Sequence, residues 1–512
     1  NFLVVLKARG TYLKQVEVTG IVTNERGEPL PGASVKVKGS TLGTSTNQEG
    51  RFTLNVPDDA VLEITYVGYQ TLEVSVGGRS EINISLSPSV REQDQIVIVG
   101  YGTQRKLDVT GAVAQIKGDE LAKQPSINPI SALQGKVAGV QITNSGAPGA
   151  SPQIRIRGLG TVYGNPNPLY VVDGVWFDDI SFLNPADIDN LSVLKDASAQ
   201  SIYGIRAANG VILITTKKGR SGKPVVSYNG FAGWSKMTNE VKMANANEYA
   251  TIINELNAIN GGGGNLLDPS QFGEGTNWYR QILRNAFINN HQVSISGGAD
   301  KSTYSFSVGY LRQDGLVKGN QFDRYTLRLQ NDFQIASNFK TGYTITGAAS
   351  NSDDIPGGIF RELYTAAPVV PVYYADGSYG DPTDFNLGDG ANYNPQATLD
   401  FFDQRSKNYR LNGNLFAELK FLRNFTFRSS VGGEFGQGEV RNYVPVYTAT
   451  FKQRNTTSRL SLSRAETRNW ILENTLTYDK KFGDHGVRVL VGQSAQRYQF
   501  YRVAMSAPNV PN

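Results

Sequence analysis

The sequence predicts a mainly β protein with three parts: a small β-sandwich, a mixed α/β domain and a transmembrane antiparallel β-barrel. Glycine and aromatic residues are abundant, with 55 Gly, 25 Tyr and 23 Phe in 512 residues, whereas only 19% of the residues are charged. This balance suits β structure with polar loops. Short β-branched runs alternate with turn residues near the beginning of the chain. Long stretches of strict apolar–polar alternation fill its second half.

The composition argues against several classes of function. The formal net charge of +5 is small for this length and no block of basic residues occurs, so we expect no nucleic-acid partner. The complete absence of cysteine fits an exported protein. No run of about 18 apolar residues is present, so we expect no transmembrane helix.

No arrangement of residues predicts a catalytic or metal site. The sequence contains no G-x-x-x-x-G-K-[ST], H-E-x-x-H or G-x-S-x-G pattern. Its two histidines, His291 and His485, are far apart in sequence, and a lone histidine is more often structural than a ligand. We therefore expect no enzymatic activity, no cofactor and no metal. The acidic pairs are more simply interpreted as loop or cap residues: Asp178 with Asp179, and Asp187 with Asp189.

The first part of the chain divides into two segments. Residues 1–17 are expected to be the tail of a preceding domain or a linker. Because the chain begins at Asn1 without an initiator methionine, we expect the numbering to start inside a longer precursor. Residues 18–88 contain the runs SVKVKG, RFTLNV and VLEITYVG, separated by Gly, Pro, Asn and Asp turns. Strands at this spacing predict a β-sandwich.

A linking segment at residues 89–104 leads into residues 105–219, which have the mixed character of an α/β domain. Asp196 is expected to begin a short helix and Gly204 to end it. The run Val211–Thr216 is apolar on both faces, as in a strand buried inside a domain. Turns of this domain are expected at Gly158, at Asp173–Gly174 and at Asn209–Gly210.

Residues 220–512 are expected to form part of a transmembrane barrel. The stretch YRLNGNLFAELKF places apolar side chains on one face and polar ones on the other, and similar stretches recur nine or ten times. Long strands joined alternately by tight and long connections are typical of outer-membrane barrels. A soluble antiparallel sheet with one wet face remains the alternative. The alternating apolar face of this stretch comprises Tyr409, Leu411, Gly413, Leu415, Ala417, Leu419 and Phe421.

Several segments in sequence order resemble a known family. LQGKVAGVQI, IRIRG, LYVVDG and LSVLKDASAQSIYGIRAANGVILITTKKG together resemble the plug of SusC-like (SusC/RagA family) TonB-dependent outer-membrane transporters of Bacteroidetes. VTGIVTNERGEPLPGASVKVKG resembles the carboxypeptidase-regulatory-like domain that precedes this plug, and DQIVIVGYGTQRK resembles its TonB-box region. The resemblance therefore implies that residues 89–104 are the TonB-box region. The resemblance spans residues 18–219, and a full-length member has about twice the length of this chain.

The resemblance implies a 22-stranded barrel, of which about the first half is present, with the plug inside it. It implies a location in the outer membrane, in contact with its lipid, and an N-terminal domain in the periplasm. It also implies active import of a large nutrient, a glycan or a peptide, powered by the TonB–ExbB–ExbD complex and assisted by a SusD-like surface lipoprotein. A structural subunit of a larger outer-membrane assembly or export complex is the alternative, and a soluble carbohydrate-binding sandwich protein is disfavoured by the alternating strands.

The resemblance also assigns roles to individual residues. The TonB-binding segment is expected to be an extended strand that a partner captures through main-chain hydrogen bonds, although an ordinary interdomain strand would look the same. Arg155 and Arg157 alternate along one strand, so both are expected to lie on the same face. They are expected to reach the barrel wall and pair with carboxylates such as Glu418 and Glu473, with a solvated charged face as the alternative. The TonB-binding residues would be Asp94, Gln95, Ile96, Val97, Ile98 and Val99, and the plug–barrel contacts Arg155, Arg157, Lys195 and Arg206.

Overall fold

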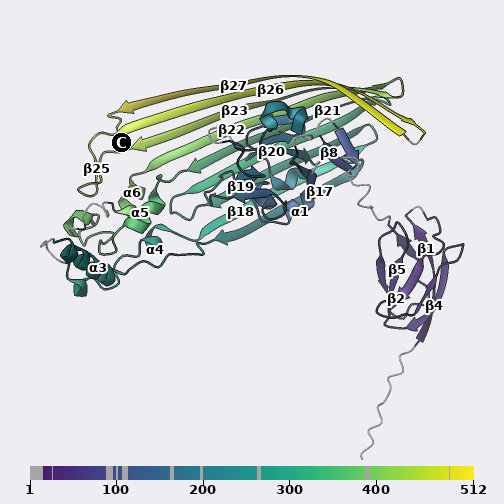
Figure 1. Ribbon diagram of the computed structural model, residues 1–512, viewed down its shortest axis with the longest axis horizontal. Coiled ribbons are helices and arrows are strands. Elements are labelled where there is room, and N and C mark those ends of the chain that lie inside the picture. Colours follow the sequence, from purple (N-terminus) through teal and green to yellow (C-terminus); the bar gives the residue numbers. More distant parts are fainter. Residues whose placement is uncertain are drawn as a thin grey trace, which may run out of the picture. The chain divides into compact units, whose positions relative to one another are not determined.

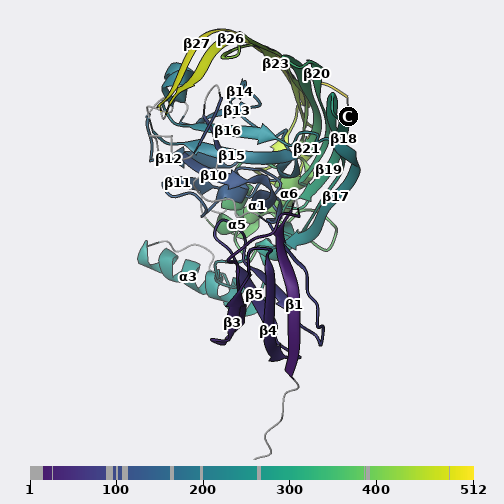
Figure 2. The same ribbon diagram turned by 90° about the vertical axis from the view of Figure 1, so that its right-hand side faces the viewer.

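The structure is a computed structural model of the whole chain, viewed in Figures 1 and 2. It describes residues 15–25, 27–87, 96–99, 102–105, 113–161, 166–196, 200–261, 267–385, 387, 393–483 and 485–511. Contacts divide the chain into two compact units. One unit comprises residues 1–98 and 102–110, and the other comprises residues 99–101 and 111–512.

The N-terminal unit contains a β-sandwich. One sheet has the order β4-β1-β7, and the other has the order β3-β2-β5-β6. Phe52, Leu54 and Val56 alternate with exposed residues along β4, and their side chains belong to the core between the sheets. The sandwich predicted from the spacing of short runs is therefore present. Its strands are β1 (Gln15–Asn24), β2 (Ser34–Val37), β3 (Gly43–Ser45), β4 (Arg51–Pro57), β5 (Val61–Thr65), β6 (Leu72–Ser75) and β7 (Ile84–Leu86).

Two short strands follow the sandwich in sequence. β8 (Ile96–Val99) pairs with β9 (Gly102–Arg105) in a two-stranded sheet. The β-branched run at the end of the predicted TonB-binding segment is therefore extended, as its composition suggested. Asp94 and Gln95, the first two residues of that segment, lie outside the described residues.

The plug is a mixed α/β domain with a five-stranded sheet of order β10-β15-β16-β13-β14. β13 and β16 pair in parallel, and the other neighbours pair antiparallel. Ile212 and Ile214 of β16 are buried in the core of the domain, as expected for a central strand. The strands are β10 (Val113–Lys117), β13 (Leu169–Val172), β14 (Val175–Phe177), β15 (Ile188–Leu194) and β16 (Val211–Thr216), with a separate pair β11 (Val140–Thr143) and β12 (Gln153–Ile156).

Short helical segments connect these strands. They are α1 (Gly118–Ala122), η3 (Ser131–Leu133), η4 (Pro185–Asp187) and η5 (Ser201–Ala207). Gly204 separates two helical stretches of η5, at the position where the sequence predicts that a helix ends. It lies inside η5 with φ 63° and ψ −154°, a conformation that is essentially restricted to glycine. The chain therefore kinks at Gly204 and continues helically to Ala207.

Nine antiparallel strands follow the plug in a single curved sheet, and Figure 2 shows the plug strands lying within its curve. Every strand pairs with its neighbour in sequence, apart from the small hairpin between β23 and β26. The strands are 13 to 24 residues long. They are β17 (Gly222–Ser235), β18 (Ala286–Ala299), β19 (Ser302–Asp314), β20 (Gln321–Ala336), β21 (Phe339–Asp353), β22 (Asp403–Phe421), β23 (Phe425–Val444), β26 (Arg459–Phe482) and β27 (His485–Pro508).

The two ends of this sheet differ. Turns of two or three residues join β18 to β19, β20 to β21, β22 to β23 and β26 to β27 at one end. Most connections at the other end are long and form a small core of their own around Trp278, Ile282 and Leu363. Short turns on one side and long loops on the other are typical of outer-membrane barrels, in which the short turns are periplasmic. The long connections contain α3 (Ala246–Ile259), η6 (Pro269–Gln271), α4 (Trp278–Ile282), α5 (Ile359–Thr365), η7 (Pro382–Phe385), α6 (Pro395–Asp400), β24 (Tyr447–Thr448) and β25 (Arg454–Asn455).

No helix among the described residues is long and apolar enough to cross a membrane.

Candidate functional site

The candidate site is the surface where the plug meets the inner face of the curved sheet. Cross-strand register places one row of polar side chains along this face, because directly opposed residues share a face of a sheet. The row runs from β19 through β20, β21, β22 and β23 to β26. Most of these side chains are buried. The row comprises Ser307, Arg328, Thr346, Asn412, Glu434 and Asn469.

Asp187 of the plug is held by two neighbouring strands of the wall. Gln292 Nε2 of β18 and Ser307 Oγ of β19 donate to its Oδ1 at 2.6 Å and 2.8 Å. The carboxyl is 6% exposed. Its burial raises its pKa above the usual value and outweighs the opposite effects of Arg328 and the two hydrogen bonds. A buried acid with hydrogen-bond donors from the wall thus anchors η4 of the plug.

Arg328 of β20 anchors the end of the central plug strand. Its side chain is only 1% exposed, and Nη2 donates to Thr216 Oγ1 at the end of β16. The Thr216 hydroxyl in turn donates to Asp173 Oδ2 at 2.5 Å, and the Thr216 backbone N–H donates to Oδ1 at 3.0 Å. Wall, central strand and hairpin turn therefore form one continuous polar network.

Asp173 and Gly174 are the two residues between β13 and β14, with φ of 48° and 90°. Positive φ at both positions is the geometry of a type I′ hairpin turn, which Asp–Gly favours. Asn414 of β22 donates a hydrogen bond to the carbonyl oxygen of Asp173. The turn expected from the sequence is therefore also a contact with the wall.

A second ion pair lies nearer the long loops. Arg410 Nη1 of β22 is 3.0 Å from Asp179 Oδ2 of the plug. Burial alone would raise the pKa of the Asp179 carboxyl, but Arg410 and hydrogen bonds from Ser151 and Ser181 hold it below its ordinary value. Asp179 is therefore a carboxylate at neutral pH.

Further hydrogen bonds extend the contact. Arg324 of β20 donates to the carbonyl oxygens of Ser181 and Ile127. At the short-turn end, the backbone N–H of Gly219 donates to Gln330 Oε1 at 3.0 Å. Polar side chains of the wall therefore contact the plug along its length.

This arrangement reverses the charges that the sequence analysis predicted. The predicted contacts placed arginines on the plug and carboxylates on the wall, whereas the structure places Arg328 and Arg410 on the wall and Asp179 on the plug. Arg155 bonds inside the plug, to Asn167 Oδ1 at 2.9 Å and to the Ile154 carbonyl oxygen at 2.8 Å.

The other three predicted contact residues also have partners within the plug. Arg157 pairs with Asp196 at 2.5 Å, Lys195 donates to the Ala138 carbonyl oxygen at 3.1 Å, and Arg206 pairs with Asp178 at 2.7 Å. Arg157 was expected to share a face with Arg155, but β12 ends at Ile156 and Arg157 has a φ of 58°. Strand alternation therefore does not extend to it.

The two wall carboxylates proposed as partners lie elsewhere in the sheet. Glu418 pairs with Arg428 of the neighbouring strand at 3.2 Å. Glu473 is buried on the inner face of β26. The remaining predicted turn positions have the expected backbone, since Gly158 and Gly210 have φ of 100° and 101° and Asn209 directly precedes Gly210.

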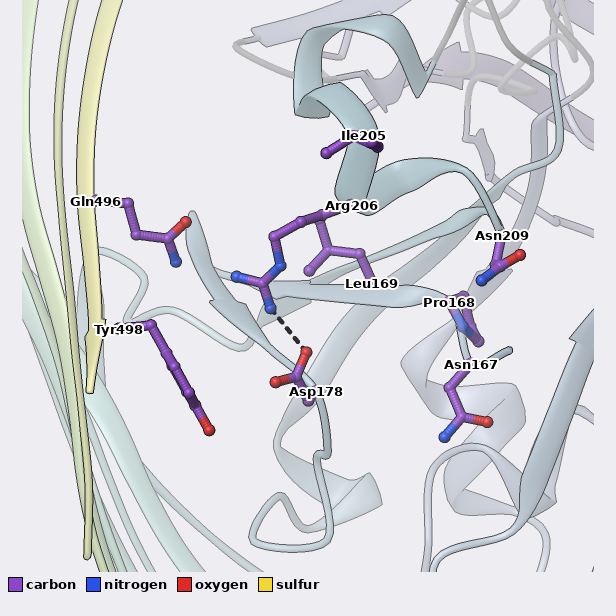
Figure 3. A pocket seen from close by; sticks show the side chains of 9 residues that line it. All are labelled: Asn167, Pro168, Leu169, Asp178, Ile205, Arg206, Asn209, Gln496 and Tyr498. Atoms are coloured by element: carbon purple, nitrogen blue, oxygen red, sulfur yellow. Dashed lines mark hydrogen bonds and ion pairs between the residues drawn. The ribbon is translucent and has the colours of Figure 1, made fainter. Parts of the chain in front are cut away.

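A cavity of about 540 Å³ lies between the plug and β27 (Figure 3). Figure 3 shows Arg206 and Asp178 paired in its middle, with Gln496 and Tyr498 entering from the wall. The Arg206 guanidinium also lies 5.8 Å from the centre of the Trp176 ring. No sequence pattern indicated this cavity, because its two walls are almost 300 residues apart. Its lining comprises Asn167, Pro168, Leu169, Asp178, Ile205, Arg206, Asn209, Gln496 and Tyr498.

Two domain families match the chain in the order of the fold. Residues 18–98 match the CarboxypepD_reg-like domain, and residues 105–211 match the TonB-dependent Receptor Plug Domain. The first match covers the sandwich and β8, and the second covers the plug up to the start of β16.

Curated relatives cover nearly the whole chain. The TonB-dependent receptor P3 of Formosa agariphila is 36% identical over 96% of this chain and 49% of its own length. The TonB-dependent receptor SusC of Bacteroides thetaiotaomicron is 35% identical over 85% of this chain and 46% of its own length. This chain therefore spans about half the length of the curated relatives it matches.

Solved structures agree with this result. The RagAB peptide importer in its 'open-open' state superposes with a TM-score of 0.70 and 25% identity, covering 81% of this chain and 50% of that one. The relatives are receptors and transporters rather than enzymes, which confirms the expectation of no enzymatic activity. The fold, the two domain matches and the relatives together show that the chain is an outer-membrane protein with a partial β-barrel and a plug, and that it belongs to the SusC-like TonB-dependent receptors.

Proposed function

We propose that the protein imports a large nutrient, a glycan or a peptide, across the outer membrane in a TonB-dependent manner, together with a SusD-like surface lipoprotein. The relatives named as TonB-dependent receptors and the neighbour named as a peptide importer support this class of activity. Energy would come from the TonB–ExbB–ExbD complex. In this proposal residues 18–88 form the N-terminal β-sandwich, residues 89–104 the TonB-box region, residues 105–219 the plug and residues 220–512 the partial barrel. Residues 1–17 would be the tail of a preceding domain or a linker.

The observation that carries this proposal is the polar character of the surface where the plug meets the inner face of the curved sheet. The apolar core of the plug is almost entirely internal to the plug. The wall reaches the plug mainly through hydrogen bonds and ion pairs, such as those of Gln292, Arg328 and Arg410. Polar contacts of this kind exchange for water at modest net cost, whereas an apolar core does not. In this proposal the plug shifts within the barrel while each part keeps its own fold.

β8 supplies the coupling element in this proposal. A TonB-type partner would pair with β8 through main-chain hydrogen bonds, as an added strand. β9 already occupies one edge of β8. The partner would therefore bind the other edge of β8 or displace β9.

A proline substitution tests this role of the main chain. Val97→Pro in the full-length protein removes one backbone N–H from β8, whereas Val97→Ala keeps it and serves as the matched control. Both variants are expressed in a deletion strain of the native host at equal surface levels, and growth is measured on defined glycans or peptides as sole carbon source. We expect Val97→Pro to abolish growth on the transported class and Val97→Ala to retain it.

Normal growth of a strain that lacks residues 94–99 altogether would refute TonB-driven import. That result would favour the alternative role as a structural subunit of an outer-membrane assembly or export complex. The class of compound that supports growth of the Val97→Ala strain but not of the deletion strain identifies the substrate as glycan or peptide.

A further inference from the structure

The outer face of the curved sheet carries an apolar belt. Register places the outward side chains of β22, β23, β26 and β27 in continuous rows, and their polar neighbours of opposite parity face the plug. On β22 the belt extends over nine residues, from Leu411 to Leu419, which suits one tilted crossing of a bilayer. Exposed members of this belt include Leu411, Leu415, Leu419, Phe427, Val431, Phe435, Trp470, Leu476 and Val491.

Four cations lie on the same outward face, on the long-loop side of these residues, and Val503 and Met505 of β27 lie beyond them. We call Lys407, Arg464, Arg468 and Arg497 the outer basic patch. Lys407 lies four residues beyond Leu411 along β22, in the direction of the loops. Arg497 lies directly opposite Trp470, a belt residue of β26. All four side chains are exposed.

Carboxylates neutralise only part of this charge. Arg464 Nε lies 2.7 Å from Glu439, and Arg468 pairs with Glu466 on its own strand. Neither Lys407 nor Arg497 forms an ion pair with any other residue that the structure describes. With Glu439 and Glu466 included, four positive and two negative charges leave a surplus of two cations at this position.

Other outward charges near the same edge are balanced or acidic. Arg405 of β22 lies 3.2 Å from Asp403 and 3.8 Å from Asp353. On β19 and β20, Arg312 is accompanied by two outward acids, Asp314 and Asp323, and pairs with Asp314 at 3.5 Å. The cationic surplus is therefore local to β22, β26 and β27, which argues against a general property of the barrel edge.

Two of the cations are spaced to share one anion. Arg468 lies directly opposite Gln499, so Arg497 is its diagonal neighbour across the strand pair. Such neighbours are about 7–8 Å apart at the backbone, within reach of two long side chains converging on one group. Guanidinium groups bind phosphate oxygens through paired hydrogen bonds.

We propose that the outer basic patch binds the phosphate of a lipid headgroup in the outer leaflet. The long-loop end of the sheet faces the cell exterior, because short turns mark the periplasmic end. The patch continues directly from the apolar belt, so an occupant can place acyl chains on the belt and its phosphate on the patch. A soluble anion would use only the cations, and an acidic protein would leave the belt exposed.

The first test needs no variant. The full-length protein is purified in detergent, mixed with lipid A or with the same lipid stripped of its phosphates, and analysed for bound lipid by native mass spectrometry. We expect retention of phosphorylated lipid A only. Equal retention of both lipids overturns the proposal, and so does full displacement of lipid A by inorganic phosphate at equal concentration.

The second test localises the site. Arg468→Gln combined with Arg497→Gln should weaken lipid A binding at least about tenfold, because two charge-assisted hydrogen-bonding groups are lost. Arg405→Gln, on the same face but balanced by Asp403 and Asp353, is the matched control and should bind as the wild type does. Unchanged binding by the double variant, or equal loss in the control, overturns the assignment.

Discussion

The ion pair between Arg410 and Asp179 offers the sharpest test of how the wall holds the plug. Arg410→Gln removes the charge of the wall, Asp179→Asn removes that of the plug, and the double variant completes a thermodynamic cycle. Exposed pairs contribute about 0–1 kcal/mol, and breaking a buried pair costs about 3–5 kcal/mol. Both side chains are about one-third exposed, at 30% and 31%. We therefore expect a coupling energy of about 2 kcal/mol, which lies between these limits.

The assay is solute leak through the full-length protein reconstituted in liposomes. A loss of about 2 kcal/mol in plug docking corresponds to a roughly thirtyfold larger population of the undocked plug, and hence to a comparable rise in leak. Arg428→Gln is the matched control, because Arg428 pairs with Glu418 of the wall. A coupling energy near zero, or equal leak from the control, would refute the role of this pair in docking.

The pH dependence of the same pair has a defined sign. The folded-state pKa of Asp179 lies below its usual value. The stabilisation from this carboxylate is therefore fully present above the ordinary aspartate pKa and is lost as the pH falls through the lowered value. The contribution of this pair to docking should stay constant from pH 8 to pH 5, and any rise in leak due to the pair should begin only below about pH 4.

Three other predictions follow from the structure. Asp187 has a raised pKa, so its contribution to docking is full below the ordinary aspartate pKa and is lost as the pH rises through the raised value. Asp187→Asn should therefore remove this part of the pH dependence of plug unfolding, which calorimetry measures. Gly118→Ala would place a Cβ 1.8 Å from the Ile188 carbonyl oxygen and should destabilise the plug by about 2 kcal/mol or more, and an unchanged melting profile would contradict the packing. Leu415→Arg, in the middle of the apolar belt, should cost about 2–4 kcal/mol in folding into bilayers, whereas Lys407→Arg should be neutral.

Much of the fold was predictable because its signals are local. Alternation with a period of two reports directly on the pleat of a strand, so stretches such as Tyr409–Phe421 identified barrel strands without any tertiary information. The Asp173–Gly174 hairpin was predictable for the same reason, since two residues determine its turn.

The partners of the plug were not predictable in this way. The sequence shows that Arg328 and Arg410 lie on the polar faces of their strands, but not which plug residue each one meets, because Thr216 and Asp179 are more than a hundred residues away. A single backbone angle at Arg157 was enough to remove it from the predicted face. The best sequence signal for these contacts was a cation in the middle of an alternating strand, such as Arg328 or Arg410, because a cation that faces the barrel interior requires a partner.

The order of strands in the plug sheet sets the order in which it would yield to a mechanical force. β10 is the edge strand closest to the N-terminal side, only five residues long, and it pairs with β15 alone. The opposite end of the plug chain is fastened to the wall by Arg328 at Thr216 and by Gln330 at Gly219. A pull from the N-terminal side therefore reaches the edge strand β10 first and the anchored end last. β10 can detach from the sheet while the other four strands remain fastened to the wall.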